Sequence, residues 1–149
     1  MEGREQLGEI VSSFRRISHS FQQLLGKEAE QLGITPTQFM VLRRLSQYPD
    51  MSVTELAEKL YLGNSAVSGI VERMVKAGLI TRRRSEEDRR IYRIAFTEKG
   101  REIKEKTDVS LRQHLLPLTQ IPPEDAQELL RIHGQIIQIL ERGRETLEQ

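Results

Sequence analysis

The chain of 149 residues is long enough for one domain with a real core, and its 37% apolar and 30% charged residues are typical of a soluble globular protein. No apolar run is long enough to span a membrane, and the first sixteen residues carry charges where a secretory signal would be apolar, so we expect a cytoplasmic location. The net charge of +1 excludes nothing by itself, but zero cysteines exclude disulfides, thiolate zinc sites and thiol-based redox sensing.

The first third of the chain has the pattern of amphipathic helices. Apolar residues recur every three or four positions between Gln6 and Leu25, which predicts a long first helix that Gly33 interrupts. The segment 35–38 combines a cap residue, a proline and a glutamine able to close a capping box, so it predicts a second helix. We expect that helix to end near Pro49, because proline disfavours helical geometry in the residue before it.

Two shorter helices joined by a turn are predicted next. Ser52 and Glu55 have the spacing of a second capping box, which opens the first of these helices. The segment 61–64 is rich in turn-forming residues, and we expect Asn64 to be the N-cap of the following helix, which Gly78 closes. The resulting order is helix, short turn, helix.

After Gly78 the pattern changes to that of strands. Residues 79–84 and 91–96 are β-branched, aromatic and alternating, and the polar residues 85–90 between them predict a hairpin with a charged tip. Thr97 is expected to cap a fifth helix. A last helix with a wide apolar face follows the two prolines at 122 and 123.

The basic residues are concentrated around the predicted hairpin. Residues 72–101 carry ten basic and five acidic groups, whereas residues 1–71 carry seven and eight, and residues 102–149 carry six and nine. This distribution is expected when one element faces a polyanion and the flanking elements support it. A helix, a turn, a helix and an arginine-rich hairpin together indicate a winged helix-turn-helix, whose second helix enters the major groove of DNA while the hairpin reaches a neighbouring groove.

We expect DNA contacts from small, polar and basic side chains of this module. Short hydrogen-bonding groups at the start of the fourth helix suit base edges, and Gly69 allows the helix backbone to approach the duplex closely. The arginines supply the salt-dependent part of the affinity. The alternatives are a solvated surface for the charged residues and a capping role for the serines. The expected DNA-binding residues are Asn64, Ser65, Ser68, Gly69, Arg73, Arg82, Arg84, Asp88, Arg89 and Arg90.

The run SAVSGIVERMVKAGLITRRRSEEDRRIYRIAFTEKG resembles the core of the MarR (multiple-antibiotic-resistance regulator) family, and Asp88 and Arg90 match its Asp-x-Arg motif. The resemblance implies a mainly α fold with a small β-hairpin wing. It places a winged helix-turn-helix at about residues 35–100 within a single domain of residues 1–149. It also implies that Arg90 contacts DNA and that Asp88 holds the wing in place through an arginine such as Arg73.

The same resemblance implies a homodimer formed by the N- and C-terminal helices, about residues 1–34 and 101–149. The length of the first helix favours this, because a module of this size cannot cover its whole apolar stripe. A twofold dimer predicts a palindromic DNA operator with half-sites about one helical turn apart. The implied function is a sequence-specific transcription regulator, a repressor released by a small amphipathic effector. Candidate effector-lining residues, for which core packing is the alternative, are Phe14, Ile17, His19, Phe21 and Phe39.

Other functional classes lack sequence support. No glycine-rich phosphate loop, nucleophile elbow or Cys/His pairing is present, so we do not expect an enzyme. The three histidines His19, His114 and His133 lack the spacing of metal ligands, and we expect neither a metal nor another cofactor. The remaining alternative is a winged helix that binds another transcription factor instead of DNA. The effector, the operator sequence and the choice between repression and activation are left open.

Overall fold

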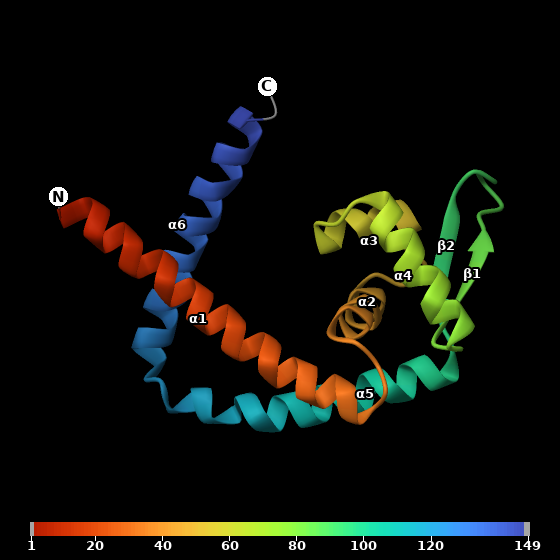
Figure 1. Cartoon of the computed structure of the whole chain (residues 1–149), viewed down its shortest axis with the longest axis horizontal. Coiled ribbons are helices and arrows are strands. Elements are labelled where there is room, and N and C mark those ends of the chain that lie inside the picture. The colour runs from red at the N-terminus through yellow and green to blue at the C-terminus, as the bar shows by residue number, and fades with distance from the viewer. Residues whose placement is uncertain (1, 148–149) are drawn as a thin grey trace. The chain divides into compact units, whose positions relative to one another are not determined.

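The computed structural model describes residues 2–147, and the chain divides into two compact units, residues 1–114 and residues 115–149 (Figure 1). The first unit contains the elements from α1 to α5, including a β-hairpin, and the second contains a short 3-10 helix, η1, and the last helix, α6. Among the described residues, no helix combines the length and the apolar character that crossing a membrane requires.

The first two helices agree with the sequence pattern. Helix α1 spans Glu2–Gln31, and Gly33 follows it with a φ of +75°, a left-handed conformation that glycine adopts without strain. Helix α2 spans Pro36–Gln47. The capping boxes predicted at Thr35 and at Ser52 both form, with reciprocal bonds between side chain and backbone of 3.0 to 3.3 Å.

The helix-turn-helix consists of α3, Val53–Leu60, and α4, Asn64–Lys76. Tyr61 ends α3 in a left-handed conformation and turns the chain. The expectation that Asn64 is the N-cap of α4 is wrong, because Gly63 occupies that position and no side chain caps the helix. Gly63 already has extended backbone angles, and its carbonyl accepts the first helical bond from the Val67 amide at 3.1 Å. The Asn64 side chain is therefore not used at the helix start.

The predicted hairpin is confirmed as β1, Ile80–Arg84, and β2, Tyr92–Phe96, which pair antiparallel. The register places Ile80 opposite Phe96 and Arg84 opposite Tyr92. The residue Ser52, directly before α3, forms an isolated antiparallel bridge with Arg93 of β2. The wing is thus joined at its base to the start of the helix-turn-helix.

The core of the first unit lies between α2, α3, α4 and the hairpin. Helix α2 contacts α1, α3 and β2, while α4 contacts α3 and β1. The apolar side chains at helical and alternating spacing meet there and are almost completely buried. They include Phe39, Leu42, Leu45, Met51, Leu56, Val67, Val71, Met74, Ile80 and Ile94.

Helix α5, Glu98–Leu115, begins against the base of the wing. The Thr97 hydroxyl accepts a hydrogen bond from the Gly100 amide at 3.0 Å, as its expected capping role requires, and donates one to the Gly78 carbonyl at 2.6 Å. Gly100 is buried so tightly that a Cβ there would overlap the backbone carbonyl oxygen of Leu79. The position of α5 relative to the wing therefore depends on a glycine.

The second unit contains η1, Leu116–Gln120, and α6, Pro123–Leu147. None of the described residues of α6 is buried, although the helix carries a row of large apolar side chains. Those exposed in α6 are Leu129, Leu130, Ile132, Ile137, Ile139, Leu140 and Leu147.

Candidate nucleic-acid interface

Helix α4 has one buried face and one exposed polar face. Val67, Val71 and Met74 recur at helical spacing and are fully buried against the rest of the first unit. The predicted base-facing residues Asn64, Ser65 and Ser68 are all exposed. None of these three side chains takes part in a cap of α4, so their hydrogen-bonding groups are available to an external partner.

Gly69 lies on the same side of α4 as Arg73. A Cβ built at Gly69 would be 3.5 Å from Nη1 of Arg73, which shows that the guanidinium extends back along the helix over the glycine. This is the i, i+4 geometry of residues one turn apart. The predicted contact residues of α4 thus include a basic group directly beside a position with no side chain.

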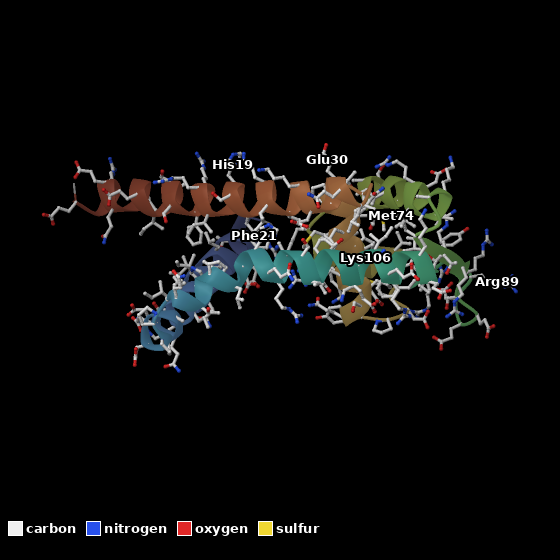
Figure 2. All side chains as sticks on the ribbon, turned by 90° about the horizontal axis from the view of Figure 1, so that it is seen from below. His19, Phe21, Glu30, Met74, Arg89 and Lys106 are labelled. Atoms are coloured by element: carbon white, nitrogen blue, oxygen red, sulfur yellow. The ribbon has the colours of Figure 1, made fainter. Side chains whose placement is uncertain are left out.

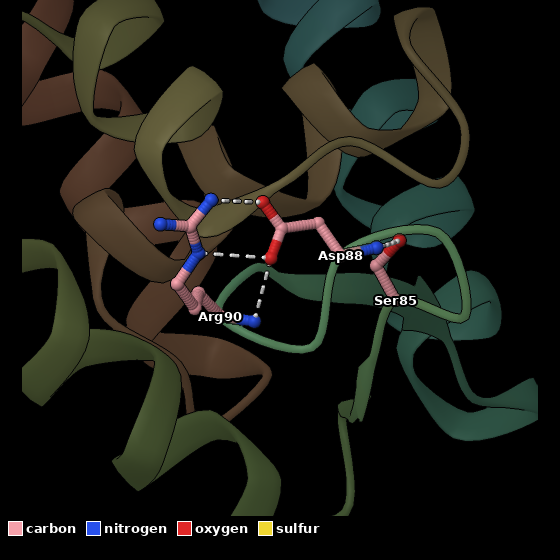
Figure 3. A network of polar contacts seen from close by, with 3 residues as sticks. All are labelled: Ser85, Asp88 and Arg90. Carbon is pink, nitrogen blue, oxygen red and sulfur yellow. Dashed lines mark hydrogen bonds and ion pairs between the residues drawn. The ribbon is translucent and has the colours of Figure 1, made fainter.

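The tip of the wing is held by a local network around Asp88 (Figure 3). Oδ1 of Asp88 accepts hydrogen bonds from the backbone amide and Nε of Arg90 at 3.0 and 3.1 Å, and Oδ2 accepts one from Nη2 at 3.0 Å. The Asp88 carbonyl accepts from the Ile91 amide at 3.0 Å, and the Ser85 amide donates to the Ile91 carbonyl at 2.8 Å. These bonds give the tip a defined conformation.

The partner of Asp88 is Arg90 and not the expected Arg73. The reason is local geometry, since a residue two positions away in a tight turn can bond through both backbone and side chain. Hydrogen bonds from the Arg90 side chain and then from its backbone hold the pKa of the Asp88 carboxyl below its ordinary value, and the same pairing raises the pKa of Arg90. The ion pair is consequently formed at neutral pH.

Arg90 is held and yet accessible. Its side chain is 90% exposed despite the bidentate pairing, and a guanidinium has further N–H donors beyond the two that Asp88 accepts. Arg89, its neighbour, projects from the end of the hairpin in Figure 2 and is exposed. The wing tip therefore presents two adjacent cations, one of which has a fixed orientation.

Arg82 and Arg84 flank one aromatic ring. Their Cζ atoms lie 4.9 and 5.5 Å from the centroid of the Tyr92 ring, and Nε of Arg84 donates a hydrogen bond to the Tyr92 hydroxyl at 3.2 Å. Cation–π contacts of this kind orient the guanidinium groups while leaving their edges open. Tyr92 was not among the expected site residues. A signal for it was present in the sequence, because an aromatic residue in the second predicted strand follows an arginine-rich first strand.

Arg83 and Arg93 lie on the opposite face of the hairpin from that pair. They are cross-strand neighbours, and both donate hydrogen bonds to Asp50, which lies between α2 and α3. Asp50 was not among the expected site residues. The alternation of side chains along a strand shows that Arg83 points away from Arg82 and Arg84, but the partner that it meets there is 33 residues away in the sequence.

The expected effector-lining residues do not form one group. Phe14, Ile17 and Phe21 share one exposed face of α1, whereas His19 lies on the other side of the helix from Phe21, as Figure 2 shows. Phe39 is fully buried in the core of the first unit, where its aromatic ring packs against other apolar side chains. Within residues 2–147, no three His, Cys, Asp or Glu residues are grouped so that they could hold a metal ion.

Comparisons with known proteins agree with the winged helix-turn-helix fold. The model of the MarR family matches residues 34–92, which include the helix-turn-helix and most of the wing. The organic hydroperoxide resistance transcriptional regulator of Bacillus subtilis is 35% identical to the chain over 120 residues, which are 80% of this chain and 78% of that protein.

Solved structures share the fold. The crystal structure of AbsC, a MarR family transcriptional regulator from Streptomyces coelicolor, has 27% identity and a TM-score of 0.77, covering 89% of this chain and 92% of that chain. The overoxidized AbfR bound to DNA has a TM-score of 0.73 at 21% identity, covers 93% of this chain and 97% of that chain, and supports the fold alone. The family model matches the chain, and the Bacillus subtilis regulator is 35% identical to it over 80% of its length. The chain therefore belongs to the MarR family of transcriptional regulators.

Proposed function

We propose that this protein binds a palindromic DNA operator as a homodimer and represses transcription until a small amphipathic effector releases it. The observation that carries the proposal is the pairing of two surfaces within one unit. The start of α4 exposes Asn64, Ser65 and Ser68, whose side chains do not cap the helix, and the wing presents Arg90 in a fixed orientation. Such an arrangement suits base edges in the major groove and phosphates or a minor groove beside it.

Dimerisation would account for apolar surface that the single chain leaves exposed. Helix α1 exposes Leu7, Ile10, Phe14 and Ile17 along one stripe, and α6 has no buried residue among those described. Contiguous apolar surface of this kind normally marks an interaction site. A twofold dimer through these helices presents two copies of α4 and so matches an inverted repeat.

The effector is proposed to act on the spacing of the two α4 helices. The exposed stripe of Phe14, Ile17 and Phe21 on α1 is the part of the expected lining that lies together. A tenfold loss of operator affinity requires only about 1.4 kcal/mol of differential binding between two states. Because the 149 residues contain no cysteine, the signal is not a thiol oxidation, whatever the related hydroperoxide-resistance regulator uses.

Equilibrium binding to the upstream region of the protein's own gene, compared with a scrambled duplex, tests the proposal. We expect a preference for the specific duplex that falls steeply with salt. Arg90→Ala should weaken specific binding about tenfold and lower the slope of log K against log salt by about one. The control is Lys106→Ala, which removes the same charge from an exposed position on α5 and should change neither quantity by as much.

Three outcomes would contradict the proposal. Equal binding to both duplexes at every salt concentration would show that the protein does not recognise a specific sequence. A pull-down that recovers a partner protein but no DNA would favour the alternative function, a winged helix that binds another protein. A stable monomer in solution at the concentrations used would remove the dimeric arrangement on which the palindrome depends.

A further inference from the structure

We propose that Asp50 is a positioning residue for operator binding, which holds the wing against the helix-turn-helix by engaging Arg83 and Arg93. These two arginines are then structural, and the DNA contacts of the wing come from the other face and the tip. The inference rests on the proposed DNA-binding function.

Asp50 contacts both strands of the wing, one through its side chain and the other through its backbone. Its Oδ1 accepts a hydrogen bond from Nη2 of Arg83 at 2.9 Å, and its backbone carbonyl accepts one from Nη1 of Arg93 at 3.0 Å. Asp50 has a φ of +58°, a left-handed conformation that is uncommon for a residue with a side chain. That conformation presents the carboxylate and the carbonyl to the two strands at once.

The residues after Asp50 continue the attachment. The Ile94 amide of β2 donates a hydrogen bond to the Met51 carbonyl at 3.0 Å, and Ser52 bridges with Arg93. Ser52 is also the N-cap of α3. The segment 50–52 therefore runs along the edge of β2 and leads directly into the helix-turn-helix, so its position and the position of the wing are linked.

Charge explains why a carboxylate is needed at this point. Arg83 and Arg93 are directly opposite each other in the hairpin register, and like charges in that relationship are unfavourable. Asp50 places one negative charge and one carbonyl oxygen beside them. Without the carboxylate, repulsion between the two guanidinium groups would favour a different position of the strands.

The run of three arginines in β1 is thus divided between two tasks. Side chains alternate along a strand, so Arg82 and Arg84 lie on one face with Tyr92, while Arg83 lies on the other with Asp50. The Arg83 and Asp50 side chains are both 56% exposed, and an ion pair with that exposure adds little to global stability. Its expected effect is on the placement of the wing.

The test is the sign of the change in operator affinity in Asp50→Asn. Asparagine keeps the left-handed backbone accessible and removes one negative charge. If Asp50 positions the wing, the variant binds its operator about threefold to fivefold more weakly, Arg83→Ala loses the same factor, and the double variant loses no more than either single change. The control Glu87→Gln removes the same charge from an exposed wing-tip residue that takes no part in the bonds of Asp50 to Arg83 and Arg93, and this variant should bind DNA slightly more tightly.

If Arg83 is instead a phosphate contact, the results reverse. Asp50→Asn would then free Arg83 and tighten binding, and Arg83→Ala would lower the salt slope by about one while Asp50→Asn would not. Either result overturns the proposal. Hydrogen exchange of the Ile94 amide in the DNA-free protein is a separate measurement. This amide bonds to the Met51 carbonyl beside Asp50, so loss of the Asp50–Arg83 ion pair in Asp50→Asn should speed its exchange several-fold. Unchanged protection would also overturn it, whereas failure of the wild-type protein to prefer its operator would overturn only the DNA-binding function.

Discussion

The buried carboxylate of Glu28 on α1 lies 3.2 Å from Nδ1 of His114 near the end of α5. The same nitrogen lies 2.9 Å from the Ser110 carbonyl oxygen. Because both neighbours are acceptors, Nδ1 must carry the hydrogen, whatever the state of the other ring nitrogen. The Glu28 side chain is only 7% exposed, so this contact compensates a carboxylate that water hardly reaches.

Replacing His114 with alanine should therefore destabilise the protein. Leaving a buried polar group without its polar neighbour costs about 1–3 kcal/mol, and chemical denaturation at fixed protein concentration measures the loss. The double variant Glu28→Gln/His114→Ala is the control. It should recover part of the loss, because a neutral amide is less costly to bury than a carboxylate, and a double variant no more stable than His114→Ala would count against this account.

Gly100→Ala should be strongly destabilising. Its Cβ would overlap the Leu79 carbonyl oxygen and lie 3.4 Å from Cδ2 of Leu42, so α5 would have to move away from the wing base. Overpacking of this kind costs about 1–3 kcal/mol or more. Thermal unfolding measures the effect, and Gly8→Ala in α1 is the matched change, because nothing lies within 4 Å of its Cβ. Similar melting temperatures for the two variants would show that α5 adapts.

Gly69→Ala should separate DNA binding from stability. The new methyl group would be in ordinary contact with Arg73, and alanine is favoured over glycine inside a helix by about 0.5–1 kcal/mol, so the variant should be slightly more stable. If α4 approaches DNA closely at this position, operator affinity should nevertheless fall about tenfold. Titration of a labelled operator together with thermal unfolding checks both parts, and unchanged affinity would place Gly69 outside the interface.

Tyr92→Leu should weaken operator binding more than Tyr92→Phe. Phenylalanine keeps the ring on which Arg82 and Arg84 rest and loses only the hydroxyl that Arg84 contacts, whereas leucine removes both cation–π contacts. At about 0.5–1 kcal/mol for an exposed contact of this kind, we expect the leucine variant to lose about fivefold in affinity. Binding isotherms at one salt concentration measure the order, and equal affinities of the two variants would argue that the ring has no role.

The conformation of the wing tip should be independent of pH between about 5 and 8. The pKa of Asp88 is lowered by its bonds to Arg90, so the contribution of the pair is complete above the ordinary carboxyl pKa of about 3.9 and is lost as pH falls through the lower folded value. Side-chain NMR of Arg90 follows the transition. Asp88→Asn should show no such transition, and a change in the wild-type protein near neutral pH would mean that another group controls the tip.

The order of elements was predictable because it depends on local signals. Helical and alternating periodicities, two capping boxes, Gly78 and the proline boundaries each act within a few residues, and they predicted the helix-turn-helix and the hairpin. The position of the Asp-x-Arg motif was recognisable in the same way. Where two local signals competed, at Gly63 and Asn64, the prediction chose the better hydrogen-bonding side chain, while the structure uses the residue with the extended backbone.

Contacts between distant segments were decided only by the folded chain. Asp50 with Arg83, Glu28 with His114, and Gly100 with Leu79 each join residues that no periodicity relates. The sequence by itself therefore determined which elements form and that one of them is strongly basic, because propensity and patterning are local properties. The tertiary structure alone decided that Arg83 and Arg93 meet Asp50 while Arg82 and Arg84 do not, since that depends on what packing brings beside each face of the hairpin.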